Sequence, residues 1–134
     1  MTTQDTMHDF ENAPLLDDGL KLRLLHDEVG GQVRDIVDKF LEILPDRLRH
    51  LAHSHARGDT VDFTIEAHRL KGAAATLGAE RMAALCAHLE ARGKAGILPE
   101  PALLHALDDL SIQVREIMTR TVARYAGDVP CSLP

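Results

Sequence analysis

A long segment of regularly spaced apolar residues constrains the fold of this chain more than any other feature. Between Gln32 and Arg57, apolar residues recur at spacings of three and four: Val33, Ile36, Val37, Phe40, Leu41, Leu44, Leu48 and Leu51. With about 3.6 residues per turn, this spacing places them on one face of an α-helix. Such an amphipathic helix must bury its apolar face against a neighbour. Pro45 falls inside the segment, and we expect it to kink or split the helix because proline removes a backbone donor.

Four further segments have helical patterns, and no segment indicates a convincing strand. The expected helices run from about Leu15 to Val29, from Thr60 to Leu77, from Ala79 to Lys94 and from Pro101 to about Tyr125. Long amphipathic helices with short connections predict an all-α fold, an antiparallel four-helix bundle in which the short N-terminal helix caps one end. We expect a flexible N-terminal arm over residues 1–13, the bundle over 14–126 and a C-terminal tail over 127–134.

The composition excludes several classes of partner. The net charge is -6 and no dense basic segment occurs, which argues against nucleic acid as a ligand. No apolar run is long enough to cross a bilayer, so we expect no membrane association. The chain has two cysteines, which predicts no disulfide framework and fits a reducing, cytoplasmic location. No spare apolar stripe is visible, which favours a monomer.

The third helix has an unusual outer face. Its core-facing stripe comprises Phe63, Ala67, Leu70, Ala74 and Leu77, and His68 lies roughly 140° from the centre of that stripe. The outward face around His68 is apolar or small where solvated helices usually carry long charged residues. Such a face is typical of a docking surface. The residues that we expect to form its rim are Val61, Thr64, Ile65, Arg69 and Ala75.

The residues one turn beyond His68 indicate a chemistry for this face. Gly72 removes the side chain that would stand beside the imidazole, so a partner could close directly over the ring, although a glycine costs a helix about 1 kcal/mol. Lys71 places a positive charge beside an arriving anion. An ordinary imidazole, with a pKa of about 6.5, is mostly neutral at neutral pH and offers a nitrogen lone pair to a phosphoryl group. A neutral nitrogen nucleophile needs no general base.

Two segments carry a resemblance to a known family. HRLKGAAATLGA, from His68 to Ala79, resembles the motif H-x-L-K-G-[SA]-x-x-x-L-G of histidine phosphotransfer (HPt) domains. LCAHLEARGKAG, from Leu85 to Gly96, resembles the following helix of that family, with Lys94 in place of the usual arginine. The resemblance extends over about residues 15–125. It implies a free-standing bundle that relays phosphoryl groups in a two-component phosphorelay.

The resemblance also implies roles for single residues and for partners. His68 would be phosphorylated, on the ring nitrogen remote from the backbone, with Lys71 stabilising charge and Gly72 giving clearance. The chain would be a phosphoryl carrier without an ATP site, autokinase activity, cofactor or metal of its own. Mg²⁺ would belong to the partner, a receiver domain of a response regulator or of a hybrid histidine kinase. Glu90 stands where some relatives carry glutamine, and the sequence assigns it no role.

Other interpretations of the same residues are open. The chain could be a docking module that binds and regulates a receiver or histidine kinase without relaying phosphate, although the set His68, Lys71 and Gly72 argues against this. A third possibility is the phosphoacceptor domain of a chemotaxis kinase, which shares the bundle. His50, His53 and His55 lack a completing carboxylate or cysteine at tight spacing, so we predict no metal site there.

Overall fold

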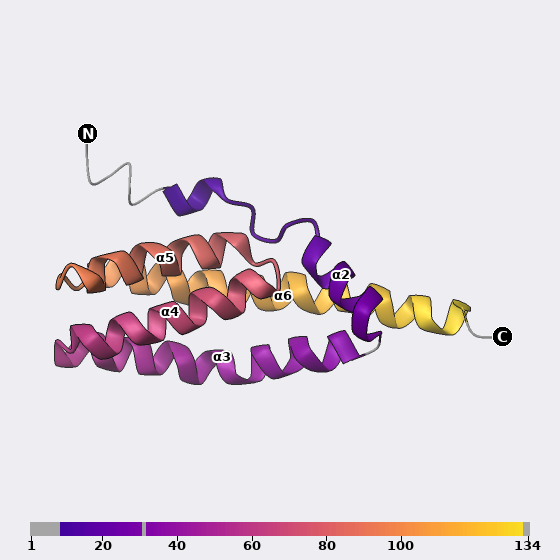
Figure 1. The fold of residues 1–134 in the computed structure, drawn as a ribbon, viewed down its shortest axis with the longest axis horizontal. Helices are drawn as coiled ribbons and strands as arrows, with labels where there is room; N and C mark the ends of the chain where they lie inside the picture. Colours follow the sequence, from indigo (N-terminus) through magenta and orange to yellow (C-terminus); the bar gives the residue numbers. More distant parts are fainter. Residues whose placement is uncertain (1–8, 31, 133–134) are drawn as a thin grey trace.

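The computed structural model describes the backbone of residues 9–30 and 32–132 and the side chains of residues 10–30 and 32–125. Within these residues the protein is all-helical, with no strand. A short 3-10 helix, η1 (Asp9–Asn12), precedes five α-helices. These are α2 (Leu20–Val29), α3 (Gln32–Arg57), α4 (Thr60–Thr76), α5 (Glu80–Lys94) and α6 (Pro101–Ser132). Figure 1 shows α3 to α6 lying lengthwise beside one another, with α2 inclined to them near the start of α3.

The sequence-predicted boundaries of the central helices agree closely with the structure. Helix α3 has the expected ends, and α4 and α5 each differ from expectation by a single residue at one end. Helix α4 begins at a cap in which the Asp59 carboxylate accepts a hydrogen bond from the backbone N–H of Asp62, at 3.0 Å. It ends before Gly78, whose φ of 85° is a left-handed conformation that residues with side chains rarely adopt.

Pro45 does not split α3, which continues through it. A proline at this position leaves the carbonyl of Leu41, four residues earlier, without its helical donor. The guanidinium group of Arg115 on α6 donates to that carbonyl at 2.7 Å. A side chain from another helix therefore replaces the hydrogen bond that proline removes.

The N-terminal part differs from expectation. Helix α2 begins at Leu20 and not near Leu15, because Asp18 and Gly19 adopt left-handed backbone with φ of 60° and 75°. Residues 9–12, expected in a flexible arm, form η1, and Phe10 is buried against the core. Arg81 on α5 holds this segment through its backbone N–H to the carbonyl of Pro14 and its side chain to that of Ala13. The remainder of the expected arm, residues 1–8, lies outside the described residues.

The C-terminal part differs as well. We expected the last helix to end near Tyr125, yet the backbone of α6 is helical to Ser132, across Gly127 and Pro130. Glycine costs a helix about 1 kcal/mol and proline about 3 kcal/mol, penalties that disfavour helical backbone without forbidding it. Among the described residues, none of the helices has both the length and the apolar character of a membrane span.

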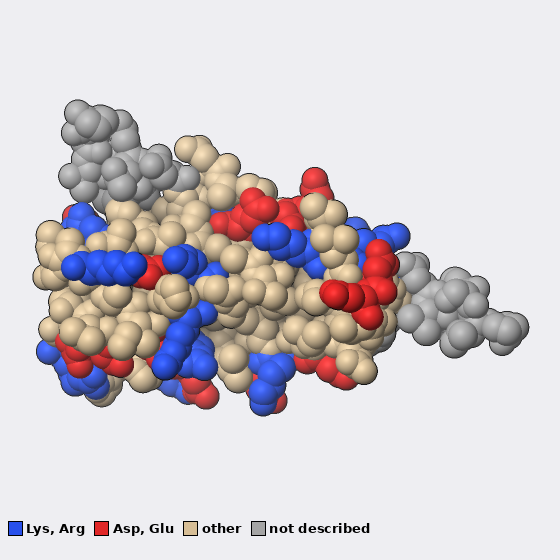
Figure 2. All heavy atoms as spheres, in the orientation of Figure 1, with Lys and Arg blue, Asp and Glu red and all other residues tan. Residues whose placement is uncertain are grey.

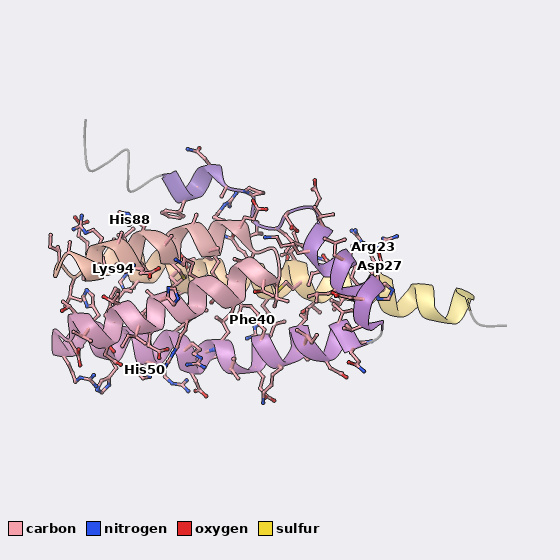
Figure 3. The ribbon with its side chains drawn as sticks, in the orientation of Figure 1. Arg23, Asp27, Phe40, His50, His88 and Lys94 are labelled. Carbon is pink, nitrogen blue, oxygen red and sulfur yellow. The ribbon has the colours of Figure 1, made fainter. Side chains whose placement is uncertain are left out.

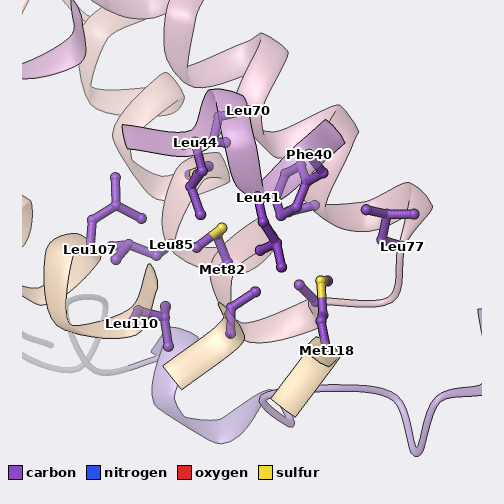
Figure 4. Close-up of a cluster of buried hydrophobic side chains, with 14 of the residues drawn as sticks. Phe40, Leu41, Leu44, Leu70, Leu77, Met82, Leu85, Leu107, Leu110 and Met118 are labelled. Carbon is purple, nitrogen blue, oxygen red and sulfur yellow. The ribbon is translucent and has the colours of Figure 1, made fainter. Parts of the chain in front are cut away.

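One apolar core connects the long helices and η1. Its members include the stripe predicted for α4 and most of that predicted for α3, together with inward-facing residues of α5 and α6. Two residues of the predicted α3 stripe differ: Ile36 is 38% exposed, and Leu48 is only partly buried. Figure 4 shows part of this cluster, with side chains from four helices meeting between the ribbons. The labelled members are Phe40, Leu41, Leu44, Leu70, Leu77, Met82, Leu85, Leu107, Leu110 and Met118. This packing fixes the rotation of α4 and hence the direction in which His68 points.

Candidate functional site

The rotation of α4 that the sequence predicts is confirmed. All five stripe residues, Phe63, Ala67, Leu70, Ala74 and Leu77, are buried. His68 points away from them, and its side chain is 65% exposed. The imidazole therefore stands on the surface of a rigid helix, where a macromolecule could reach it.

A buried carboxylate on α5 contacts the imidazole. Glu90 Oε2 lies 2.8 Å from His68 Nδ1, and the Glu90 side chain is only 6% exposed. Two lysines contact the same carboxylate: Lys71 Nζ lies 2.7 Å from Oε1, and Lys94 Nζ lies 3.3 Å from Oε2. Figure 3 labels Lys94 at the boundary between α4 and α5. Three groups that can carry positive charge thus meet at one acidic side chain.

These contacts keep Glu90 ionised. The hydrogen bond from Lys71, with those from His68 and Lys94, lowers the pKa of Glu90 from its ordinary 4.5 to about 2, although burial acts in the opposite direction. A buried carboxylate without such partners would instead take up a proton. The site therefore holds a fixed negative charge directly behind the imidazole.

The ionised carboxylate determines which ring nitrogen of His68 carries the proton. An ionised carboxylate only accepts hydrogen bonds, so Nδ1 must donate. In the neutral ring the lone pair is then on Nε2. Nε2 has no hydrogen-bonding partner among the residues that the structure describes. In this tautomer the lone pair lies on an accessible nitrogen that faces outward.

Gly72 lies on the exposed face beside His68. A Cβ added at Gly72 would meet no heavy atom within 4 Å. Packing within the chain therefore does not require glycine here, and Gly72 is not a notch for a neighbouring helix. The open space above Gly72 favours clearance for a partner as the reason for this residue.

Gly93 on α5 has the opposite role. A Cβ added at Gly93 would overlap Thr64 Oγ1, far inside van der Waals contact. Gly93 thus allows α4 and α5 to approach closely at the turn that follows Glu90. Gly93 is buried inside α5. This close approach brings Glu90 to His68.

The structure distributes the five expected rim residues over different environments. Val61 and Ile65 are exposed, at 70% and 44%, and Arg69 is exposed beside His68. Thr64 is half-buried at the contact with α5, where its hydroxyl donates to the carbonyl of Thr60. Ala75 is half-buried, and its carbonyl accepts from Lys21 Nζ of α2 at 3.1 Å. Three of the five are therefore exposed on the outer face.

Two buried acids were not identified as partners from the sequence. Glu66 and Glu90 both lie in otherwise apolar helical stripes, Glu66 three residues after Phe63 and Glu90 four residues after Cys86. A charged residue at a core-facing position was the available signal. Their partners lie on neighbouring helices, and the spacing along one helix does not show which residues those are.

Two of the other histidines are engaged elsewhere. His50 Nε2 lies 2.8 Å from Asp62 Oδ2, and His55 Nε2 lies 2.6 Å from the carbonyl oxygen of Pro99. No group of three or more histidine, cysteine or acidic residues suited to a metal ion occurs in the described part of the chain. Burial raises the pKa of Cys86 to about 12, so its thiol stays protonated and unreactive.

These features define a class: an all-helical domain that holds one accessible histidine over a buried carboxylate. The sequence model of the Hpt domain matches residues 35–120. The chain therefore belongs to the Hpt domain family, as the resemblance in its motifs implied. It is also similar to histidine-containing phosphotransfer protein B (HptB) from Pseudomonas aeruginosa PAO1, known from a crystal structure. The two chains share 30% sequence identity and superpose with a TM-score of 0.78, over 85% of this chain and 99% of that one. A search of curated proteins found no match.

Proposed function

We propose that this protein relays a phosphoryl group between aspartate residues of receiver domains through a phosphohistidine at His68. The observation that carries the proposal is the contact of His68 Nδ1 with the ionised Glu90, which places the lone pair of the neutral ring on Nε2, on an exposed face. Family membership supports phosphotransfer as the function. The donor and the acceptor would be receiver domains of a hybrid histidine kinase and of a response regulator.

The proposed step transfers a phosphoryl group without a base. The Nε2 lone pair attacks the phosphorus of an aspartyl phosphate, an N–P bond forms, and the P–O bond breaks so that the aspartate leaves as a carboxylate. The proton on Nδ1 stays in place, and the phosphorylated ring gains positive charge. The negative charge of Glu90, 2.8 Å from Nδ1, stabilises that ring. Transfer to the next aspartate reverses the step.

The neighbouring residues assist in distinct ways. Lys71, held beside His68 through Glu90, stabilises the oxygens of the transferring group, and Gly72 lets the partner approach in line with Nε2. The docking rim comprises Val61, Ile65 and Arg69, with Thr64 and Ala75 at its edges. Mg²⁺ is supplied by the receiver domain, and the chain acts as a carrier without kinase activity of its own.

The scaffold proposed for this relay is an antiparallel four-helix bundle of α3 to α6, with α2 capping one end. The lengthwise arrangement of α3 to α6 in Figure 1 and the short connections between them support it. We infer a monomer that works in the cytoplasm, where two-component receivers reside. The tertiary structure would then serve to present one face of α4 to successive partners.

Label transfer tests the proposal. Wild type, His68→Gln and His53→Gln would each be incubated with a radiophosphorylated receiver domain from the same cell. His53 is an exposed histidine on α3 and serves as the matched control. We expect acid-labile, alkali-stable label on wild type and on the control, and none on His68→Gln. Label retained on His68→Gln would contradict the assignment. Tight receiver binding without any label would instead indicate a docking module.

A further inference from the structure

Two buried carboxylates flank His68, and each holds two cations. On the α5 side, Glu90 contacts Lys71 and Lys94, as described above. On the α3 side, Glu66 Oε1 lies 3.4 Å from Arg47 Nη1. Glu66 Oε2 lies 3.0 Å from Arg69 Nη1. We refer to the four cations, Arg47, Arg69, Lys71 and Lys94, as the basic cluster.

The carboxylates and the cations of this arrangement differ in exposure. The side chains of Glu66 and Glu90 are 2% and 6% exposed, whereas those of the basic cluster range from 35% to 68%. A molecule approaching His68 therefore meets the cations first and reaches neither carboxylate. Figure 2 shows this face, with blue groups over the boundary of α4 with α5 and over the boundary of α3 with α4.

The basic cluster contrasts with the chain as a whole. The net formal charge is -6, yet four cations and only two carboxylates meet around His68. Each cation is held in place by a buried acid, so binding a partner would cost little additional side-chain conformational entropy. A preorganised patch of one sign attracts a partner of the opposite sign and raises its association rate.

We propose that the basic cluster steers an acidic surface of the receiver domain onto His68, and that Arg47 and Arg69 serve this docking and not the chemical step. The proposal rests on the proposed relay function and names the charge of the surface that fits it. Arg47 and Arg69 lie on the α3 side, away from the Glu90 carboxylate that contacts the imidazole. They can therefore be changed without removing a group that contacts the reacting ring.

The competing explanation is that Glu66 only ties α3 to α4. Both explanations predict that loss of Arg47 or Arg69 slows association with the receiver domain. They differ in what they predict for Glu66→Gln. That variant keeps both guanidinium groups and removes a negative charge. Steering then predicts an association rate equal to or above that of wild type, whereas a purely structural tie predicts the same loss as in the arginine variants. Circular dichroism would establish that each variant is folded.

The experiment measures the association rate of this protein with the receiver domain that labels it best, at about 0.02 M salt and at about 1 M salt, where the Debye length is about 3 Å. The variants are Arg69→Gln, Arg69→Glu, Arg47→Glu and Glu66→Gln. The matched control is Arg49→Glu, which changes an exposed arginine of α3 that pairs with Asp46 outside the cluster.

We expect Arg69→Glu and Arg47→Glu to slow association about tenfold at low salt, Arg69→Gln to slow it less, and the differences to shrink at high salt. We expect the control to match wild type, and phosphoramidate, a small donor that needs no docking, to label His68 equally in all variants. Unchanged rates in Arg69→Glu, or equal slowing in the Arg49→Glu control, would overturn the steering role alone. If no receiver labels or binds the wild-type protein, both the relay function and the steering role would be overturned.

Discussion

At the residue scale, the ring orientation of His68 depends on Glu90. The carboxylate is ionised and buried, so it fixes a proton on Nδ1 and leaves Nε2 as the nucleophile of the proposed relay. The same charge favours the phosphorylated ring, in which positive charge develops. Lys71 and Lys94 share this carboxylate and are thereby kept close to the imidazole. Glu90 is accordingly a positioning residue that acts through His68.

We predict that Glu90→Gln lowers the rate of His68 phosphorylation by phosphoramidate about tenfold, the factor expected for loss of a charge-assisted hydrogen bond worth about 1.4 kcal/mol. A glutamine amide can donate or accept, so it no longer selects one tautomer. Nitrogen-15 NMR of the ring should show a mixture of tautomers in the variant and a single Nδ1-protonated form in wild type. Glu80→Gln, on the first turn of the same helix, is the control. An unchanged rate with an unchanged tautomer would contradict this role for Glu90.

At the element scale, α3 and α6 are joined by a hydrogen bond that exists because of a proline. Arg115 donates to the Leu41 carbonyl, which Pro45 cannot satisfy. We predict that Arg115→Ala lowers the free energy of unfolding by about 1 kcal/mol, the value of a typical hydrogen bond. In a Pro45→Ala background the helical N–H returns, and the effect of Arg115→Ala should become smaller. Urea unfolding of the four chains measures this coupling, and equal effects in both backgrounds would show that Arg115 acts in another way.

Replacing each of two glycines on neighbouring helices by alanine should change the free energy of unfolding in opposite directions. We predict that Gly93→Ala lowers the free energy of unfolding by roughly 1–3 kcal/mol, because its Cβ would overlap Thr64 where α4 and α5 meet. Gly72→Ala should raise it by about 0.5–1 kcal/mol, since alanine favours helices and nothing within the chain obstructs its Cβ.

The functional effects of the same variants distinguish packing from clearance. Thermal unfolding gives the stability of each variant, and label transfer from a receiver gives its activity. We expect Gly72→Ala to be more stable than wild type but slower in transfer, because the new methyl group stands where the partner closes over His68. A Gly72→Ala protein with the transfer rate of wild type would remove clearance as the reason for this glycine.

At the scale of the whole molecule, the ion pairs around His68 make the folding stability of the protein depend on pH. The pKa of Glu90 is lowered to about 2 in the folded protein, below the ordinary 4.5. A depressed carboxyl pKa stabilises the folded state at pH values above the ordinary pKa, and this contribution is lost as the pH falls through the folded pKa. We predict that wild type exceeds Glu90→Gln in stability at neutral pH and that the difference declines between about pH 4.5 and pH 2. Urea unfolding across this range is the measurement, and a difference that is constant with pH would contradict the assigned cause.

The sequence determined the local features of this protein because they depend on neighbours along the chain. The apolar spacing from Val33 to Leu51 specified α3, the stripe of α4 fixed the outward direction of His68, and the motif from His68 to Ala79 indicated the family. The helix ends at Gly58 and Gly78 follow from the same short-range rules.

Only the tertiary structure decided which distant residues meet. Glu90 follows His68 by more than six turns of helix in sequence, yet its carboxylate contacts the ring, because Gly93 lets α4 and α5 approach. Arg115 compensates for Pro45 across the core, and Phe10 is buried although its surroundings in the sequence are polar. Propensity and periodicity act within a few residues, whereas these contacts depend on how the helices pack. The residue proposed to react was therefore evident from the sequence, while the groups around it that hold its ring and supply its surface charge became evident only from the fold.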